Sequence, residues 1–200
     1  MTNPSQRFQD ALDRFDQAHR EDPKTVVARG AEVQWSLLYH RRLSHWVGAL
    51  DGQASEALRL AARCQHLRRW TIPRSDFPEG VTGYKRWRNR LAQFHADAAA
   101  AVLQDVGYEE AVIARVRDLL IKKSLKRDPE VQLFEDAICL TFLENEFASF
   151  AAKHDEDKLV NIVRKTWRKM SATGHRKALE LAAQLPEPQR NLIEKALAPR

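Results

Sequence analysis

The chain has few of the features that define secreted, membrane-spanning or disulfide-rich proteins. Its 200 residues include two cysteines, Cys64 and Cys139, which lie in apolar runs and form no CxxC motif. This usage is typical of reduced core cysteines in a cytosolic protein and predicts no disulfide. No apolar run approaches the length that spans a bilayer, and the first fifteen residues lack the apolar stretch of a signal peptide. We therefore expect a cytoplasmic protein with no membrane association.

Strand-like alternation of useful length and fixed-period repeats are also absent. Apolar residues instead recur at helical spacing, and 44% of the residues are hydrophobic, which is enough for a substantial core. The pattern predicts an all-α fold, a compact bundle of about eight helices forming one domain over residues 1–200. Its core is expected at about 31–152 and a basic helical appendage at about 153–200. The expected helices span 6–20, 31–50, a stretch capped by Ser55 and ending near His66, 84–106, 109–123, 129–152 and 158–170, with two short helices after Gly174.

The stretch Ala57–Trp70, ALRLAARCQHLRRW, combines an almost wholly apolar helix with a strongly polar end. Its first half leaves little surface for water, so Gln65 and His66 should lie at the end of a largely buried helix. A buried polar end of this kind indicates a functional site.

Cations and tryptophans cluster around this stretch and the loop that follows it. The formal net charge is +6, which favours an anionic partner such as nucleic acid, a nucleotide or a phosphorylated metabolite. Arginine binds phosphate in bidentate fashion and indole rings stack on bases. The predicted phosphate-binding residues are Arg68, Arg69, Arg74, Lys85, Arg86 and Arg88, and the predicted stacking residues are Trp70 and Trp87. The loop over 71–83, with Gly80 and Gly83, has the composition of a mobile lid. The alternative is a solvated face, with tryptophans that anchor helices and arginines that pair with local carboxylates.

A buried carboxylate and three histidines suggest a metal site. Asp136 has apolar neighbours at helical spacing, so its carboxylate needs a partner in an apolar environment. His45, His66 and His95 fall on three other helices, and these four side chains could hold a divalent transition metal. The alternative is four polar core groups satisfied independently. Two other candidates are not expected to act as ligands or catalytic groups. His40 should lie at the surface or behind a ligand, and Asp155 should cap a helix rather than act with His154.

Two resemblances add to this interpretation. The run from His45 through LRLAARCQH, HADAAAAVLQDVGY and VIARVRDLLIKK to LFEDAICLTFLE, about residues 40–145, resembles an HD-domain phosphohydrolase. The resemblance implies an HD-like helical core, with His45 as the first metal ligand, Asp136 as the last and His95 as an additional histidine. Gln65 and His66 stand where the His-Asp doublet is expected.

The whole chain resembles the family called domain of unknown function 4202. The motifs that carry this resemblance are RCQHLRRW, IPR, GYKRWR, FHAD, KKSLKRDPE, FEDAICLTFLE, KHDEDK and RKTWRKMS.

These observations lead to two functional expectations. The first is a metal-dependent phosphohydrolase acting on a nucleotide or nucleic-acid phosphate. Its metal would be held by His45, His66, His95 and Asp136 and would activate a water molecule, with Glu135 and Gln65 as candidate catalytic residues. The alternative is a non-catalytic RNA- or nucleic-acid-binding protein on a degenerate HD-like scaffold, which the replaced doublet favours.

Overall fold

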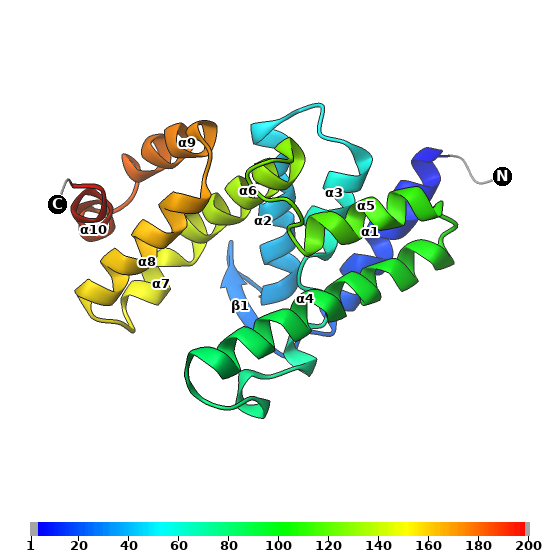
Figure 1. Cartoon of the computed structure of the whole chain (residues 1–200), viewed down its shortest axis with the longest axis horizontal. Helices are drawn as coiled ribbons and strands as arrows, with labels where there is room; N and C mark the ends of the chain where they lie inside the picture. Colours follow the sequence, from blue (N-terminus) through cyan, green and yellow to red (C-terminus); the bar gives the residue numbers. More distant parts are fainter. Residues whose placement is uncertain (1–3, 199–200) are drawn as a thin grey trace. The chain divides into compact units, whose positions relative to one another are not determined.

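A computed structural model describes residues 4–198 and is mainly helical in this part, as the sequence predicts (Figure 1). It contains ten α-helices, two short 3-10 helices and one two-stranded hairpin over the described range. The elements are α1 (Pro4–Arg20), β1 (Thr25–Ala28), β2 (Ala31–Gln34), α2 (Trp35–Leu50), α3 (Glu56–Cys64), η1 (Arg69–Thr71), η2 (Arg74–Asp76), α4 (Gly80–Asp105), α5 (Glu110–Leu120), α6 (Pro129–Asn145), α7 (Phe147–Ala151), α8 (Glu156–Lys169), α9 (Ala172–Ala182) and α10 (Glu187–Leu197). Among these helices, none combines the length and apolar character that a bilayer crossing needs.

The hairpin corrects the prediction of a helix beginning at Ala31. Strands β1 and β2 pair antiparallel, with Thr25 opposite Gln34 and Ala28 opposite Ala31. The two-residue loop between them, Arg29-Gly30, has positive φ at both positions, 51° and 79°, which matches the turn that suits strand twist. Strands of four residues are too short for a clear alternation, so the sequence pattern missed them.

The chain divides into two compact units, Met1–Lys123 and Ser124–Arg200. The division therefore falls before α6, whereas the sequence places the start of an appendage near residue 153.

In the first unit, α3 is the most deeply buried helix and packs against α1, α2 and α5. Leu58, Leu60 and Cys64 have no exposed surface, which confirms the predicted burial of this stretch. Ser55 caps the helix, since its side chain accepts a hydrogen bond of 3.1 Å from the Leu58 N–H. Burial of α3 brings its polar C-terminal end inside the unit.

In the second unit, α6 packs against α7, α8 and α9. Asp128 caps α6 by accepting from the N–H groups of Glu130 and Val131, with Pro129 at the first helical position. The single helix predicted over 129–152 is interrupted at Glu146, which separates α6 from α7. Asp155 accepts from the Lys158 N–H at 2.8 Å, which confirms its predicted capping role.

Candidate functional site

The polar end of α3 turns sharply into a basic 3-10 helix. Gln65 follows α3 and is 5% exposed, and its amide oxygen accepts a hydrogen bond of 3.2 Å from the Tyr39 hydroxyl. Arg68 then adopts a left-handed conformation, with φ of 49°. This turn lets the chain leave the core and places Arg69 at the start of η1.

Four imidazole rings from four segments of the first unit form a continuous cluster, which we call the imidazole cluster: His19, His40, His66 and His95. The rings of His19 and His40 stack with centroids 3.9 Å apart. His66 lies 5.9 Å from His40 and 5.6 Å from His95, centroid to centroid. The end of α1, the middle of α2, the end of α3 and the middle of α4 therefore meet at these side chains.

Hydrogen bonds fix the proton positions on the two innermost rings. The Nδ1–H of His40 donates to the Ser36 carbonyl at 2.6 Å, because a carbonyl can only accept. His40 Nε2 therefore carries the lone pair and accepts from the His66 backbone N–H at 3.1 Å. His19 donates from Nε2 to the Arg63 carbonyl and accepts at Nδ1 from the Ser36 hydroxyl, both at 2.8 Å. These two rings are fully satisfied and hold the His66 turn in place.

The two outer rings differ, since each has a buried nitrogen without a hydrogen-bond partner. His95 donates from Nδ1 to the Leu67 carbonyl at 2.9 Å, which leaves the lone pair on Nε2. Over residues 4–198, His95 Nε2 and His66 Nδ1 are buried and make no hydrogen bond. An unsatisfied buried polar atom costs about 1–3 kcal/mol, so each needs a ligand or water to recover that energy.

Two arginines add positive charge beside these open nitrogens. Burial, followed by the charges of Arg69 and of the neighbouring imidazoles, holds the pKa of His66 well below its usual range, and Arg88 acts in the same direction. Burial also lowers the pKa of His95 to about 4; the bond to the Leu67 carbonyl opposes this shift, and the charges of Arg69 and Arg88 reinforce it. Both rings are therefore neutral at physiological pH in a positive environment that favours an anion.

The aromatic residues around the arginines are also held in place. The Arg69 guanidinium lies over the Trp87 ring, 4.7 Å from its centroid. Trp87 donates from Nε1 to the Ile72 carbonyl at 2.9 Å, which ties α4 to the loop after η1. Tyr39 stacks on His66 with ring centroids 5.3 Å apart.

Of the four predicted metal ligands, the structure brings His66 and His95 together. His45 lies on α2, which is partly buried as predicted, but its own side chain is exposed, with Trp46 as its ring neighbour. It follows Arg41 by four positions and therefore projects from the outer face of the helix.

Asp136 belongs to the second unit and is satisfied there. It is 2% exposed and accepts from the Ser171 backbone N–H at 2.8 Å, from the Ser171 hydroxyl and from the Gln132 side-chain amide at 3.0 Å. A Cβ on Gly174 would lie 2.6 Å from the Asp136 Cγ, so only glycine fits there. The partner that this buried carboxylate requires is the start of α9. Glu135, its neighbour, is 1% exposed, with Lys169 Nζ 3.6 Å from its carboxylate.

Within the described range, no group of three or more His, Cys, Asp or Glu side chains is placed to hold a metal ion. His66 Nδ1 and His95 Nε2 are of a kind that can ligate a metal, but two imidazole nitrogens alone do not make a complete ligand set. The divalent metal stays a prediction, and we derive no chemical step from it.

Apart from Arg74, the predicted phosphate-binding residues separate into three groups. The positive charges of Arg69 and Arg88 lower the pKa values of His66 and His95, and Arg88 is exposed to solvent on α4. Lys85 and Arg86 are exposed on α4. Arg68 pairs with Glu21 at 3.0 Å.

Arg74 fixes the loop that the sequence predicts to be a mobile lid. Its guanidinium donates to the carbonyls of Phe77 and Pro78 at 2.7 and 2.8 Å. A Cβ on Gly83 would lie 1.8 Å from the Pro78 carbonyl oxygen. Gly83 thus permits close packing of the start of α4 against the loop at Pro78; the mobile lid stays a prediction.

Sequence reasoning missed His19, and it left His40 either at the surface or behind a ligand; the structure places His40 behind His66, from whose backbone N–H it accepts a hydrogen bond. His19 and His40 have no exposed surface. Their spacing contains the signal: His19 follows the buried Phe15 by four positions, and His40 lies three positions from both Leu37 and Leu43. Each therefore shares the apolar face of its helix.

The comparison with known families agrees with the motifs. A family model described as Domain of unknown function (DUF4202) matches residues 9–193. The chain therefore belongs to this family. No curated protein and no solved structure matches it.

Proposed function

We propose that this protein binds the phosphate group of a nucleotide or of a nucleic acid at the imidazole cluster and hydrolyses its phosphoester. The observation that carries the proposal is the pair of open nitrogens, His66 Nδ1 and His95 Nε2, beside Arg69 and Arg88. Neither nitrogen contributes a hydrogen bond to the fold of residues 4–198, whereas a bound ligand would supply a partner for each of them.

The two kinds of side chain suit two parts of the reaction. Arg69 and Arg88 would take the phosphate oxygens through charge-assisted hydrogen bonds. His95 Nε2 carries a lone pair, so it cannot donate to phosphate but can accept a proton from water. A bound phosphate anion would raise the affinity of this imidazole for a proton, which favours a role as general base.

The step balances without a further reactant. Water gives a proton to His95 Nε2 while its oxygen forms a bond to phosphorus. The bond between phosphorus and the ester oxygen breaks, and the leaving alkoxide takes a proton from solvent.

The test compares binding with turnover. AMP binding would be measured by calorimetry, and hydrolysis of bis(p-nitrophenyl) phosphate by p-nitrophenolate release, each with chelator and with added Mn²⁺. We expect Arg69→Ala/Arg88→Ala to weaken AMP binding by about 10- to 100-fold. The matched control is Lys85→Ala/Arg86→Ala, which removes two exposed cations from α4, the helix that also contains Arg88. Equal effects of the two double variants would contradict the site.

His95→Asn separates base chemistry from binding. The asparagine amide nitrogen can keep the bond to the Leu67 carbonyl, while the atom equivalent to Nε2 is removed. We expect turnover to fall by about 100-fold or more, with AMP affinity within a few-fold of the wild-type value. Unchanged turnover, or no turnover in the wild type with any metal added, would refute hydrolysis and leave binding alone.

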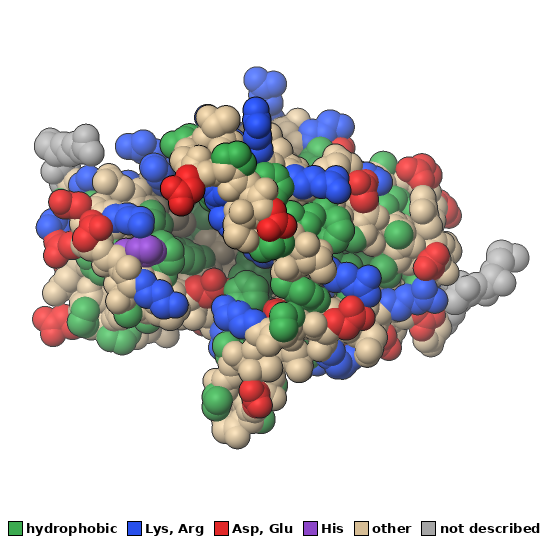
Figure 2. Space-filling model, turned by 90° about the horizontal axis from the view of Figure 1, so that it is seen from below, with side chains coloured by type: hydrophobic (Ala, Val, Ile, Leu, Met, Phe, Trp, Pro, Cys, Tyr) green, Lys and Arg blue, Asp and Glu red, His purple; other side chains and the backbone are tan. Residues whose placement is uncertain are grey.

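A second candidate is RNA binding without catalysis. The start of α4 exposes Lys85, Arg86 and Arg90 in addition to Arg88, which is a basic helix end next to Trp87. Figure 2 nevertheless shows basic side chains interspersed with acidic and hydrophobic ones on the face in view. RNA binding through phosphates should weaken steeply with salt, and affinity that does not change with salt would exclude it.

A further inference from the structure

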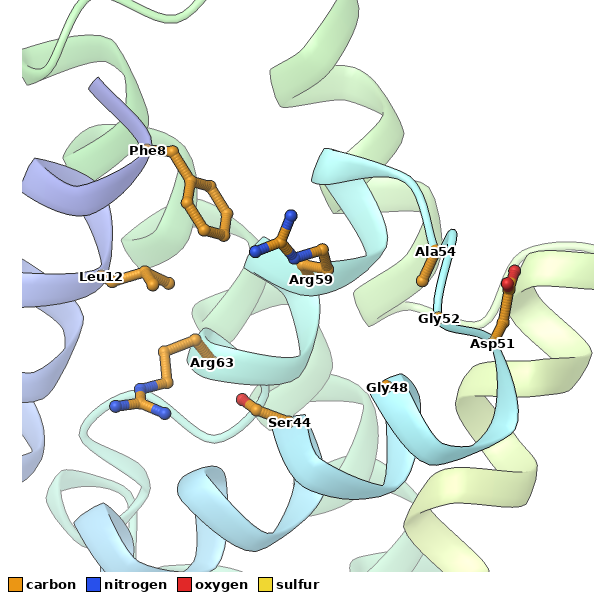
Figure 3. A pocket seen from close by; sticks show the side chains of 9 residues that line it. All are labelled: Phe8, Leu12, Ser44, Gly48, Asp51, Gly52, Ala54, Arg59 and Arg63. Carbon is orange, nitrogen blue, oxygen red and sulfur yellow. The ribbon is translucent and has the colours of Figure 1, made fainter. Parts of the chain in front are cut away.

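A groove of about 390 Å³ lies between α1, α2 and α3 in the first unit (Figure 3). Its lining includes Phe8 and Leu12 from α1, Gly48 from α2, Asp51 after it, and Arg59 and Arg63 from α3. None of these residues belongs to the imidazole cluster, and neither Arg69 nor Arg88 lines the groove.

The packing and backbone of α2 do not explain why residue 48, which lines this groove, is a glycine. It lies in the last turn of α2, where glycine is less favourable than alanine by up to about 1 kcal/mol. A Cβ at this position would meet no atom of residues 4–198 within 4 Å, and the φ of Gly48 is not positive. Neither close packing nor backbone geometry requires glycine, but its missing side chain leaves the groove open.

The two arginines of the groove differ in the partners they have. Arg63 donates two hydrogen bonds to Asp16, of 2.5 and 2.8 Å. Burial of Asp16 would raise its pKa. The bonds and charge of Arg63, followed by those of Arg41, outweigh burial and hold this pKa below its usual value. The charge of Arg63 is therefore neutralised by its own carboxylate.

Arg59 keeps its charge available. Its guanidinium lies over the Phe8 ring, 4.4 Å from the centroid, and the side chain makes no hydrogen bond or ion pair within residues 4–198. A guanidinium stacked on a ring by its face keeps its N–H groups at the edge for an anion. The stack also holds the side chain in one position, so less entropy is lost on binding.

We propose that this groove binds a small organic anion with an apolar body. The carboxylate or phosphate of the ligand would lie on the edge of Arg59, and its apolar part would contact Phe8 and Leu12. The Asp51 carboxylate at the other end of the groove (Figure 3) disfavours a second negative charge on the ligand. The proposal does not depend on the function of the imidazole cluster.

The test uses benzoate and phenyl phosphate as probes, with inorganic phosphate and benzylamine for comparison. Binding would be measured by calorimetry in Arg69→Ala/Arg88→Ala protein, so that the cluster does not contribute. Gly48→Leu fills the groove, and Ala49→Leu adds the same bulk at the neighbouring exposed position, which does not line it. We expect Gly48→Leu to weaken benzoate and phenyl phosphate binding at least about tenfold, and Ala49→Leu to have no effect.

Arg59→Gln is a second test variant. It removes the positive charge from the groove and leaves α3 intact. It should weaken both aromatic anions to a similar degree, and benzylamine should not bind in any variant. Helicity and melting temperature establish that each variant is folded. Benzoate affinity unchanged by both Gly48→Leu and Arg59→Gln would overturn the proposal, as would wild-type binding of benzylamine as tight as that of benzoate.

Discussion

Each unit buries a polar group in an apolar environment, but only one of the two groups is satisfied by the protein. In the second unit, Asp136 accepts three hydrogen bonds from Ser171 and Gln132. In the first unit, His66 Nδ1 and His95 Nε2 lie buried and find no hydrogen-bond partner in the part of the chain that the structure describes. A buried polar residue holds a fold together when its bonds are complete, and it is a candidate for ligand binding when they are not.

The largest expected effect comes from removing the satisfied group. Asp136→Ala leaves the Ser171 N–H without its acceptor and removes one of the two acceptors of the Gln132 amide, which keeps its bond to the Lys169 carbonyl, so we expect a loss of about 3–5 kcal/mol in unfolding free energy. Urea denaturation measures it. If Asp136 instead served mainly as a ligand, its removal would leave stability within about 1 kcal/mol of the wild type.

Acid should selectively weaken the first unit. Burial lowers the pKa of His19 to about 4, against 6.5 for the exposed side chain, despite the opposing bond to the Arg63 carbonyl and the charge of Asp16. The unfolded chain therefore takes up the proton first as pH falls below 6.5, and stability falls until about pH 4. A shift of this size corresponds to about 3 kcal/mol.

Urea unfolding at several pH values from 7 to 4 measures this loss. His19→Gln should be less stable at neutral pH but show a flatter dependence on pH. An equal slope in the variant would mean that other groups cause the loss.

A smaller effect is expected at the glycine beside Asp136. The Cβ of Gly174→Ala would lie 2.6 Å from the Asp136 Cγ, so we expect a loss of about 2 kcal/mol from overpacking. Gly48→Ala is the matched control, since its Cβ meets nothing, and it should gain up to about 1 kcal/mol from helix propensity. Thermal melts of both variants provide the measurement, and equal melting temperatures would disagree with the packing described.

The smallest expected effect is at the unsatisfied ring. His66→Phe keeps an aromatic ring against Tyr39 and loses no side-chain hydrogen bond to the residues that the structure describes, so stability should stay within about 1 kcal/mol of the wild type or rise. AMP binding should weaken in the same variant. A loss of stability as large as that of Asp136→Ala would remove the contrast between the two units.

The sequence predicts most of the helical fold because apolar spacing and capping residues are local signals. Ser55, Asp128 and Asp155 each cap the helix that follows them, and Gly107, with φ of 82°, follows the end of α4. The hairpin and the break at Glu146 were missed, since short strands and helix interruptions have weak local signals.

The candidate site could be predicted only in part. The sequence by itself determined that the end of α3 is a buried polar segment, that His66 and His95 are candidates and that Asp136 needs a partner, because burial follows from periodicity. Only the tertiary structure decided that His19 and His40 complete the imidazole cluster, that His45 faces outward and that Ser171 satisfies Asp136. Hydrogen-bond partners distant in sequence depend on how helices pack, and the spacing within one helix contains no information about which side chain of another helix will meet it.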